Sequence, residues 1–385
     1  MLRRAILTCS LLSLISCSHN LSNTELGLIN EDGKSESIPS LAEAYKDYFK
    51  VGAAVDSGSY ISHADLLKKH FNSLTTENEM KFEALQPQLN QFTFEVADAM
   101  LDFARNNDMA TRGHALIWHR QTPDWVFQDA DGEPVSEEVL RQRMNHHIST
   151  VMKHFGRRVD VWDVVNEAVM DDGRLRTFQE EGDDQKSRWF DILGEAYIED
   201  AFRFAHQANP DAKLFYNDYY NYLPARREAI YGLLKNLLEK GVPVHGVGLQ
   251  CHLNIHASDD PTHQSYYQTI ENLEKSIQLY ASLGLDVQIT ELDVSVYVGG
   301  KAKSEKDYYT LAAFSPELQA EQAKRYKELF EMFRRNKNII SNVTFWGVAD
   351  DNTWLSEFAS GRQDFPMLFD IKHQPKPAFD AVINF

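Results

Sequence analysis

Short apolar runs alternate with amphipathic stretches along the chain from about residue 45 onward. Eight of the runs have the length of a buried strand, and they begin near these residues: Val51, Ser73, Thr111, Val159, Lys213, Gly246, Asp286 and Asn342. Between them, apolar residues recur with a spacing near 3.6, as expected for helices that cover a core with one face. Eight strand–helix units without an antiparallel hairpin signal predict a parallel sheet.

Helix boundaries are clearest in two places. One helix is predicted to begin at Pro224 and to stop at Lys240 and Gly241, because Pro suits the first turn and Gly the end of a helix. A second is predicted over residues 316–335, again with Pro in its first turn.

These units predict an α/β fold in which the sheet closes into a (β/α)8 TIM barrel, with residues 40–385 as a single domain. The domain exceeds the ~250 residues typical of this fold, which implies long loops after the strands. A doubly wound open sheet is the alternative. It predicts a glycine-rich phosphate turn after the first strand, and residues 51–58 (Val-Gly-Ala-Ala-Val-Asp-Ser-Gly) match that turn poorly.

The N-terminal segment has the pattern of a secretion signal. Arg3 and Arg4 precede an apolar stretch over residues 5–15 that is too short to span a bilayer. Residues 14–17 (Leu-Ile-Ser-Cys) resemble the bacterial lipobox, in which cleavage precedes a lipidated cysteine. We expect residues 1–16 to be a lipoprotein-type signal peptide and residues 17–39 to be a flexible tether after lipidated Cys17. The alternative is a plain signal peptide, with Cys17 incidental.

The expected location follows from that signal. The protein is predicted to be secreted across the inner membrane and to remain as a cell-surface or outer-membrane lipoprotein, with a periplasmic or extracellular soluble protein as the alternative. Its only contact with a membrane would then be the N-terminal lipid anchor.

Charge and cysteine content narrow the expected partners. The net charge of −18 argues against nucleic acid as a partner and suits a neutral substrate. After the signal and Cys17, Cys251 is the only remaining cysteine, so no disulfide within the domain is expected. We expect a monomer.

Two glutamates give the first indication of chemistry. Glu167 and Glu291 each stand at the end of a short apolar run that reads as a buried strand. Barrel proteins place their reactive groups at these strand ends. Two carboxyl groups brought together by a fold can hydrolyse a glycosidic bond, one as acid and the other as nucleophile or base. The plain alternative for either residue is a salt bridge on the barrel rim.

The other predicted strand ends carry hydrogen-bonding and aromatic groups, which is the mixture that a sugar ring requires. They include His114 and Trp118 after the third strand, Gln250 and His252 after the sixth, and Trp346 after the eighth. Taken singly, several have ordinary interpretations. His114 could be a core histidine, Lys81 could pair with Glu77 or Glu79, Trp125 could be a packing residue, and the pair His146–His147 is expected on a solvated helix face.

A metal-dependent hydrolase is a second hypothesis. His252 and His256 are four residues apart, and His114 and His119 five apart, but such a site needs three or four converging ligands. The sequence has neither a His-x-His strand nor a His-Glu-x-x-His helix. We therefore expect no metal and no cofactor in catalysis.

From about residue 40 to its end the chain resembles the family 10 glycoside hydrolases, the retaining endo-β-1,4-xylanases. The resemblance rests on residues 76–81 (Thr-Glu-Asn-Glu-Met-Lys), 112–119 (Arg-Gly-His-Ala-Leu-Ile-Trp-His), 162–168 (Trp-Asp-Val-Val-Asn-Glu-Ala), 215–219 (Phe-Tyr-Asn-Asp-Tyr), 289–293 (Ile-Thr-Glu-Leu-Asp) and 345–347 (Phe-Trp-Gly), together with Trp354. The first two segments separate this family from others of the same barrel clan.

The resemblance implies a role for each matching residue. Glu167 would be the general acid/base and Glu291 the nucleophile, supported by Asn166, His252 and Asp293. The positions matching the family's sugar-binding residues are Glu77, Asn78, Lys81, His114, Trp118, Gln121, Gln250, Trp346 and Trp354. The implied reaction is hydrolysis of internal β-1,4-xylosidic bonds of xylan or xylo-oligosaccharides by double displacement.

Three positions depart from the family pattern: Phe82, Arg120 and Tyr220. They put the product pattern and the tolerance of substrate side chains in doubt and leave the glutamate pair intact. Two further functions stay open. One is a β-glucanase of the same clan, and the other is a carbohydrate-binding lipoprotein that has lost catalysis, for which a broken glutamate pair would be expected.

Overall fold

The computed structural model describes residues 27–29, 35–182, 185–258, 260, 267–297, 314–358 and 362–385. The chain divides into two compact units, Met1–Pro39 and Ser40–Phe385. In the first unit, β1 (Gly27–Ile29) and β2 (Ser35–Ser37) pair antiparallel. The predicted signal peptide and Cys17 lie outside the described residues.

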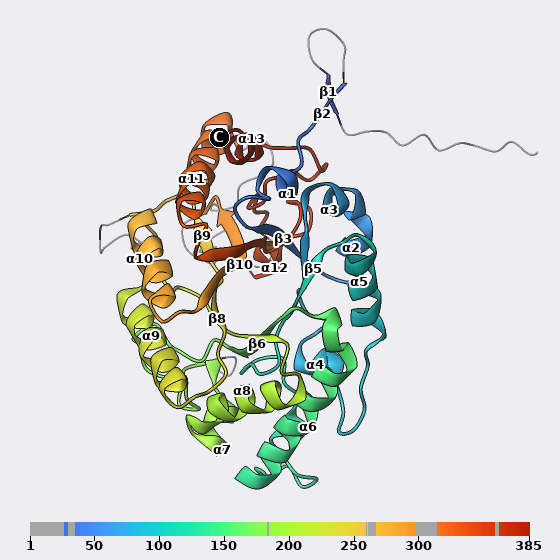
Figure 1. Ribbon diagram of the computed structural model, residues 1–385, viewed down its shortest axis with the longest axis vertical. Helices are drawn as coiled ribbons and strands as arrows, with labels where there is room; N and C mark the ends of the chain where they lie inside the picture. The colour runs from blue at the N-terminus through green and yellow to red at the C-terminus, as the bar shows by residue number, and fades with distance from the viewer. Residues whose placement is uncertain are drawn as a thin grey trace, which may run out of the picture. The chain divides into compact units, whose positions relative to one another are not determined.

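In the second unit, eight parallel strands among the described residues close into a barrel, with a short ninth strand added to one of them (Figure 1). Hydrogen bonds run in the order β11-β3-β4-β5-β6-β7-β8-β10, and β10 also pairs with β11, which completes the ring. The described strands of this unit are β3 (Lys50–Val55), β4 (Ser73–Thr76), β5 (Ala110–Gly113), β6 (Val161–Asn166), β7 (Lys213–Asp218), β8 (Gly246–Leu249), β9 (His252–Asn254), β10 (Asp286–Ser295) and β11 (Ile340–Phe345).

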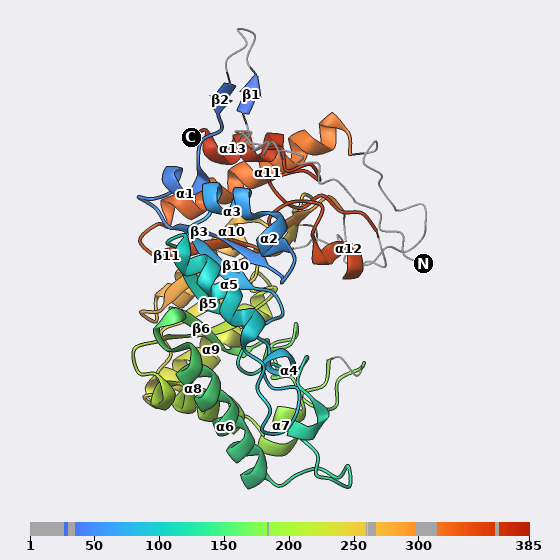
Figure 2. The same ribbon diagram turned by 90° about the vertical axis from the view of Figure 1, so that its right-hand side faces the viewer.

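Helices surround the ring of strands, and Figure 2 shows α3 and α5 on its outside. The helices described in this unit are α1 (Leu41–Ala44), α2 (Ser59–Ser62), α3 (Ala64–His70), α4 (Phe82–Leu85), α5 (Glu95–Asn106), α6 (Glu137–Phe155), α7 (Arg188–Leu193), α8 (Ala196–Ala208), α9 (Pro224–Glu239), α10 (Ile270–Ala281), α11 (Pro316–Arg335), α12 (Trp354–Phe358) and α13 (Pro377–Ile383). Two 3₁₀ turns, Asp124–Val126 and Gly156–Arg158, complete the regular structure.

The predicted (β/α)8 barrel is confirmed, and each predicted strand start lies within two residues of the observed one. The helices α9 and α11 begin at Pro224 and Pro316, as their first-turn prolines indicate. Prediction works well here because parallel strands buried on both faces have nearly continuous apolar sequences.

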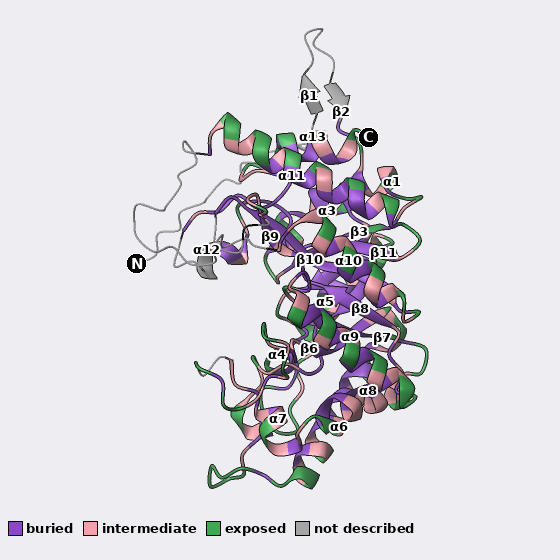
Figure 3. Cartoon of the chain, turned by 90° about the vertical axis from the view of Figure 1, so that its left-hand side faces the viewer, coloured by how far each residue is buried: buried purple, intermediate pink, exposed green. Residues whose placement is uncertain are grey.

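The core lies in and around the barrel wall, where Figure 3 shows the strands as buried and the outer faces of the helices as exposed. In β3 every residue after Lys50 is buried, and β10 is buried along its length after Asp286. In α8 the predicted stripe faces the barrel, with Ile198, Ala201, Phe202 and Ala205 all inaccessible to solvent. The barrel is therefore a packed core, and reactive groups are confined to its ends.

Within the described part of the chain, none of the helices has the length and apolar character needed to cross a membrane.

Two glycine substitutions test the packing of the wall. A Cβ at Gly113, in β5, would overlap the Trp162 ring of β6, whereas a Cβ at Gly232, in α9, would meet no atom within 4 Å. We expect Gly113→Ala to lower the free energy of unfolding by about 1–3 kcal/mol through overpacking. The control Gly232→Ala should raise it by about 0.5–1 kcal/mol, because alanine favours a helix interior. Urea unfolding of both variants measures this, and equal effects would contradict the packing.

Candidate active site

The two glutamates reach one site because their strands end at the same face of the barrel. Glu167 directly follows β6. Glu291 lies inside β10, which is three strands further along the ring. The gap is spanned by β7 and β8, whose ends contribute Asn217 and Gln250. Register pairs Asn166 with Asn217 across β6 and β7. The strands therefore set the order of the side chains around the site.

The Glu291 carboxylate is buried and accepts a hydrogen bond on each oxygen. Asn217 Nδ2 donates to Oε1 at 2.7 Å, and His252 Nε2 lies 3.1 Å from Oε2. Thr290 donates its hydroxyl to Asn217 Oδ1 at 2.7 Å, which fixes the amide with its nitrogen toward Glu291. The orientation of Glu291 is thus set from two sides before any substrate binds.

The Glu167 carboxylate has different surroundings. Trp118 Nε1 donates to its Oε2 at 2.8 Å, and Gln250 Nε2 donates to its Oε1 at 2.9 Å. Asn166 Nδ2 contacts the same Oε1 at 3.2 Å. These donors are neutral, whereas Glu291 has a histidine partner with two carboxylate neighbours. The two carboxyl groups are therefore in different electrostatic environments, as distinct acid/base and nucleophile roles require.

Two asparagine amides connect the glutamates. Asn217 Nδ2 donates both to Glu291 Oε1 and, at 2.9 Å, to Asn166 Oδ1, while Asn166 Nδ2 contacts Glu167. The carboxylates, far apart in sequence, thus belong to one continuous hydrogen-bond network. Glu291 pairs with His252 of the site itself, and the partners given above for Glu167 are neutral, so among the described residues these contacts differ from a simple rim salt bridge.

His252 lies between two carboxylates. Its Nδ1 is 2.7 Å from Asp293 Oδ2, and Trp354 Nε1 donates to the same oxygen at 2.9 Å. Burial disfavours the charged imidazole, but Asp293 and Glu291 outweigh it and raise the pKa of His252 to about 10. His252 is therefore an imidazolium at neutral pH and donates one N–H to each carboxylate. Metal coordination by His252 would compete with both bonds.

Residues after β4 and β5 form a second cluster beside the pair. Lys81 Nζ donates to Asn78 Oδ1 at 2.9 Å and lies 4.8 Å from the centre of a Trp118 ring. Gln121 Nε2 contacts the same Asn78 oxygen at 3.3 Å. Burial lowers the pKa of Lys81, although the nearby Glu291 and Glu167 carboxylates act in the opposite direction. The lysine thus lies within electrostatic reach of both glutamates.

Glu77 belongs to the same strand end and is held partly neutral. Burial and the neighbouring Asp56 carboxylate raise the pKa of Glu77 to about 8. A protonated carboxyl group can donate a hydrogen bond as well as accept one, which suits contact with a hydroxyl group.

His114 combines its two predicted interpretations. It is buried, and its Nδ1 is 2.9 Å from Asp163 Oδ2, which also accepts a hydrogen bond from Arg112. Its ring also meets Trp346 edge to face, with centroids 5.3 Å apart. The Trp346 ring in turn lies edge to face with the His252 ring, with centroids 6.4 Å apart. His114 is therefore a satisfied core histidine that supports an aromatic wall of the site.

The backbone is strained where three successive strands end. Glu167, Tyr220 and Cys251 lie within two residues of the ends of β6, β7 and β8, with φ of 59°, 48° and 58°, and Gln121, in the loop after β5, has φ of 45°. Side-chain-bearing residues reach this left-handed region at a cost of order 1–3 kcal/mol each, and such residues gather at functional sites. Their position marks this end of the barrel as the functional one.

Sequence reasoning missed part of the site and misjudged one residue. Asn217 and Thr290 were not assigned a role, although both lie in segments that carry the family resemblance. The prediction that His147 lies on a solvated face is wrong. His146 is exposed, but His147 is buried. Its ring stacks on that of Phe82 with centroids 3.5 Å apart, and its Nδ1 forms a hydrogen bond with Gln86 Oε1. Phe82, an unusual residue for the family, thus packs inside the fold.

The remaining departures and Trp125 are also placed. Trp125 packs against Phe82 and donates to the backbone oxygen of Pro87, which fits a packing residue. The Arg120 guanidinium lies 5.6 Å from a Trp118 ring, and Tyr220 is an exposed aromatic residue. Arg120 therefore borders the site through the Trp118 ring, whose indole N–H donates to Glu167.

A closed parallel barrel with paired glutamates at its strand ends is the architecture of a class of glycoside hydrolases. The sequence model of glycosyl hydrolase family 10 matches residues 40–385, and the chain belongs to this family.

Curated relatives and solved structures agree with that membership. An endo-1,4-beta-xylanase from Geobacillus stearothermophilus is 44% identical over 353 residues, covering 90% of this chain and 99% of the relative. A beta-1,4-xylanase from Dictyoglomus thermophilum is 44% identical over 364 residues, covering 94% and 95%. A mutant structure solved in complex with xylotriose matches with a TM-score of 0.81 and 42% identity, covering 90% of this chain and 100% of the other.

The charged state of His252 predicts a pH-dependent cost of removing its partner. The pKa of His252 in the folded protein, about 10, is above its ordinary value of 6.5. The stability that the charged His252 contributes is therefore fully present below pH 6.5 and is lost as the pH rises through 10. Asp293→Asn should therefore lower the free energy of unfolding by about 3–5 kcal/mol below pH 6.5, the usual cost of breaking a buried pair. Urea unfolding across this range should show the cost shrinking with pH. A cost that stays constant would refute the assignment.

Proposed function

We propose that the protein is a retaining endo-β-1,4-xylanase in which Glu167 is the general acid/base and Glu291 the nucleophile. One observation carries this assignment. In a member of glycosyl hydrolase family 10, the two glutamates lie in one hydrogen-bond network through Asn166 and Asn217, and their partners differ in charge. A paired acid and nucleophile in different environments is what double displacement requires.

In the first step, Glu291 attacks the anomeric carbon and the glycosidic C–O bond breaks. Glu167 gives its proton to the departing oxygen, so the leaving chain departs as a neutral alcohol. His252 and Asn217 orient the attacking carboxylate through the hydrogen bonds at 3.1 and 2.7 Å. The product of this step is a covalent glycosyl-enzyme.

In the second step, Glu167 removes a proton from water, and the water oxygen attacks the anomeric carbon. The bond to Glu291 breaks, its carboxylate is regenerated, and the configuration at the anomeric carbon is retained after two inversions. Trp118 and Gln250 hold Glu167 through bonds to separate oxygens, so the same carboxyl group serves both steps without moving away.

The substrate class is supported by the site's chemistry and by the names of its relatives. Relatives that cover nearly the whole chain are named xylanases, and the matching mutant structure holds xylotriose. Trp346 and Trp354 flank His252, with Trp354 at 4.8 Å, and supply aromatic faces for the C–H side of a sugar ring. Amides and charged groups of Asn78, Lys81 and Gln121 would bind hydroxyl groups.

Substitution of each glutamate tests the proposed function. We expect Glu291→Ala to lower kcat on xylan by roughly 10⁴-fold or more, as loss of a nucleophile does in other hydrolases. Glu167→Ala should lower it by about 10²–10⁴-fold and should retain more activity on substrates with a good leaving group. Azide should restore part of its rate, since this anion can replace the lost base. Reducing ends released from xylan measure the activity.

Two outcomes would contradict this proposal. Full activity of Glu291→Ala on xylan would remove the nucleophile assignment. If the wild-type enzyme released reducing ends faster from carboxymethylcellulose than from xylan, the β-glucanase alternative would replace the substrate class. The variant Asn107→Ala, at the end of α5, leaves the site's hydrogen bonds in place and serves as the control.

We also propose that the chain is a lipoprotein anchored through Cys17. The support is the sequence alone: a basic start, a short apolar stretch and Leu-Ile-Ser-Cys over residues 14–17. The net charge of −18 of the full chain gives the protein no attraction to an anionic membrane surface, so membrane association would depend on the lipid.

Fractionation of the producing bacterium tests the anchor. The wild-type protein should appear in the membrane fraction and should accumulate as the precursor when globomycin is added. Cys17→Ala should appear in the soluble fraction or the medium, since without the thiol no lipid can be attached. Identical fractionation of the two proteins would refute lipidation, and Cys251→Ala is the matched control because Cys251 is buried in the barrel domain.

A further inference from the structure

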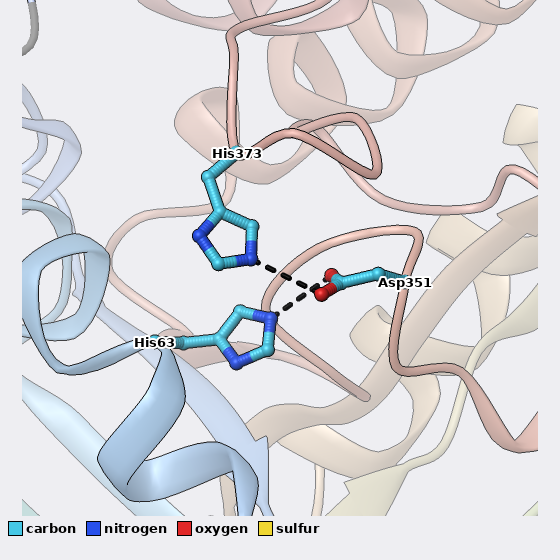
Figure 4. A group of neighbouring side chains, drawn as sticks. All are labelled: His63, Asp351 and His373. Carbon is cyan, nitrogen blue, oxygen red and sulfur yellow. Dashed lines mark hydrogen bonds and ion pairs between the residues drawn. The ribbon is translucent and has the colours of Figure 1, made fainter.

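Three side chains from separate parts of the chain converge outside the site described above: His63, Asp351 and His373 (Figure 4). His63 Nε2 lies 3.0 Å from Asp351 Oδ1, and His373 Nε2 lies 3.2 Å from Asp351 Oδ2. Among the described residues, this is the group whose ligand atoms approach closely enough to hold a metal ion, all within 4.8 Å of one another.

The distances are close to those around a single shared ion. In a tetrahedral zinc site, Zn–N and Zn–O bonds of about 2.1 Å place neighbouring ligand atoms roughly 3.4 Å apart. The two nitrogen–oxygen separations, 3.0 and 3.2 Å, are to different oxygens of Asp351, and the three ligand atoms lie within 4.8 Å of one another, so a shared ion requires them to draw together around it. Figure 4 shows both imidazole rings directing a nitrogen at the carboxylate.

Each ligand is oriented by its surroundings. Ser62 Oγ lies 2.8 Å from His63 Nδ1, and an Nδ1–H donated to that hydroxyl leaves the Nε2 lone pair available for a metal. His63 is nearly inaccessible, with 3% of its side chain exposed. His373 has φ of 62°, a strained conformation, and its ring centroid lies 4.3 Å from that of His63. Such strain at a polar cluster is a feature of ligand sites.

The alternative is a pair of hydrogen bonds without metal. In that state each imidazole would donate its Nε2–H to the Asp351 carboxylate, and Ser62 would donate its hydroxyl to His63 Nδ1. A metal would instead take both Nε2 lone pairs and use the carboxylate as a third ligand, with the Nδ1–H of His63 donated to Ser62. Asp351 is 36% exposed, which leaves water access to a fourth position.

We propose that His63, Asp351 and His373 form a structural binding site for a divalent transition-metal ion, with Zn²⁺ as the preferred ion and water as fourth ligand. Two imidazoles and one carboxylate suit zinc and disfavour Mg²⁺ or Ca²⁺, which prefer all-oxygen sites. The site takes no part in the reaction of Glu167 and Glu291.

The ion would connect segments that follow the first and the last strand of the ring, β3 and β11. His63 lies between α2 and α3, which follow β3, and Asp351 follows β11. The strands β3 and β11 pair with each other, and Asn352 donates to Asp56 at 2.7 Å across the same junction. His373 adds the segment that leads into α13. A metal there would therefore stabilise the closure between the first and last strands of the ring.

Metal titration tests the site directly. The full chain, produced without a polyhistidine tag and freed of metal with EDTA, is titrated with Zn²⁺ by calorimetry. We expect one ion per chain, a Tm that rises with Zn²⁺ concentration, and visible d–d absorption of four-coordinate Co²⁺ when that ion is used instead. His63→Ala and His373→Ala should each abolish all three signals. Ser62→Ala should weaken Zn²⁺ binding by about 10–100-fold, as loss of an orienting partner does.

A matched control separates this site from any histidine–aspartate pair. His154 lies 2.9 Å from Asp98, and no third metal ligand joins this pair among the described residues, so His154→Ala should bind Zn²⁺ as the wild type does. Equal Tm values of the wild type and His373→Ala in EDTA would show that the variant folds. No Zn²⁺ uptake by the wild type, or uptake unchanged in both His63→Ala and His373→Ala, would overturn the proposal.

Discussion

The parallel hydrogen-bond ladder of the barrel continues past the strand ends into the residues of the site. The backbone N–H of Glu167 donates to Asn217 O at 2.9 Å, that of Gln250 to Asp218 O at 3.0 Å, and that of Glu291 to Gln250 O at 3.0 Å. The main chain of each glutamate is thus hydrogen-bonded to a residue at the end of a neighbouring strand. Because the ring is closed by β10 and β11, a shift of one strand would displace every neighbour.

Buried ionic pairs lie beside this ladder of hydrogen bonds. Arg112 donates to Asp163 in one cluster, and Arg226 to Asp218 at 2.9 Å in another. Burial raises the pKa of Asp218 to about 6 even though Arg226 opposes it. A buried pair of this kind adds little net stability, but removing one partner is costly. These pairs therefore serve mainly to fix positions around the site.

The fold and the identity of most site residues could be predicted because both depend on local sequence. Apolar runs mark the strands, and the residues just after them are the ones that converge, so Glu167, Gln250 and Trp346 could be named. His147 could not, because its burial depends on Phe82 stacking from another segment. The same holds for His63, Asp351 and His373, which come from three separate segments of the chain. Strain at Glu167 and Cys251 likewise leaves no trace in a sequence of ordinary residues.

Electrostatic balance explains why so acidic a protein can carry a site for a neutral polymer. The carboxyl groups of Glu167, Glu291 and Asp293 are accompanied by two basic groups: Lys81, within electrostatic reach of both glutamates, and His252, which stays charged because its pKa is about 10 and which pairs with Glu291 and Asp293. Glu77, with a pKa near 8, adds little negative charge at neutral pH. A neutral sugar cannot offset the negative charge of the site's carboxylates, so basic side chains of the protein must do so. Recognition then depends on amides and on indole rings, whose contacts do not alter that charge.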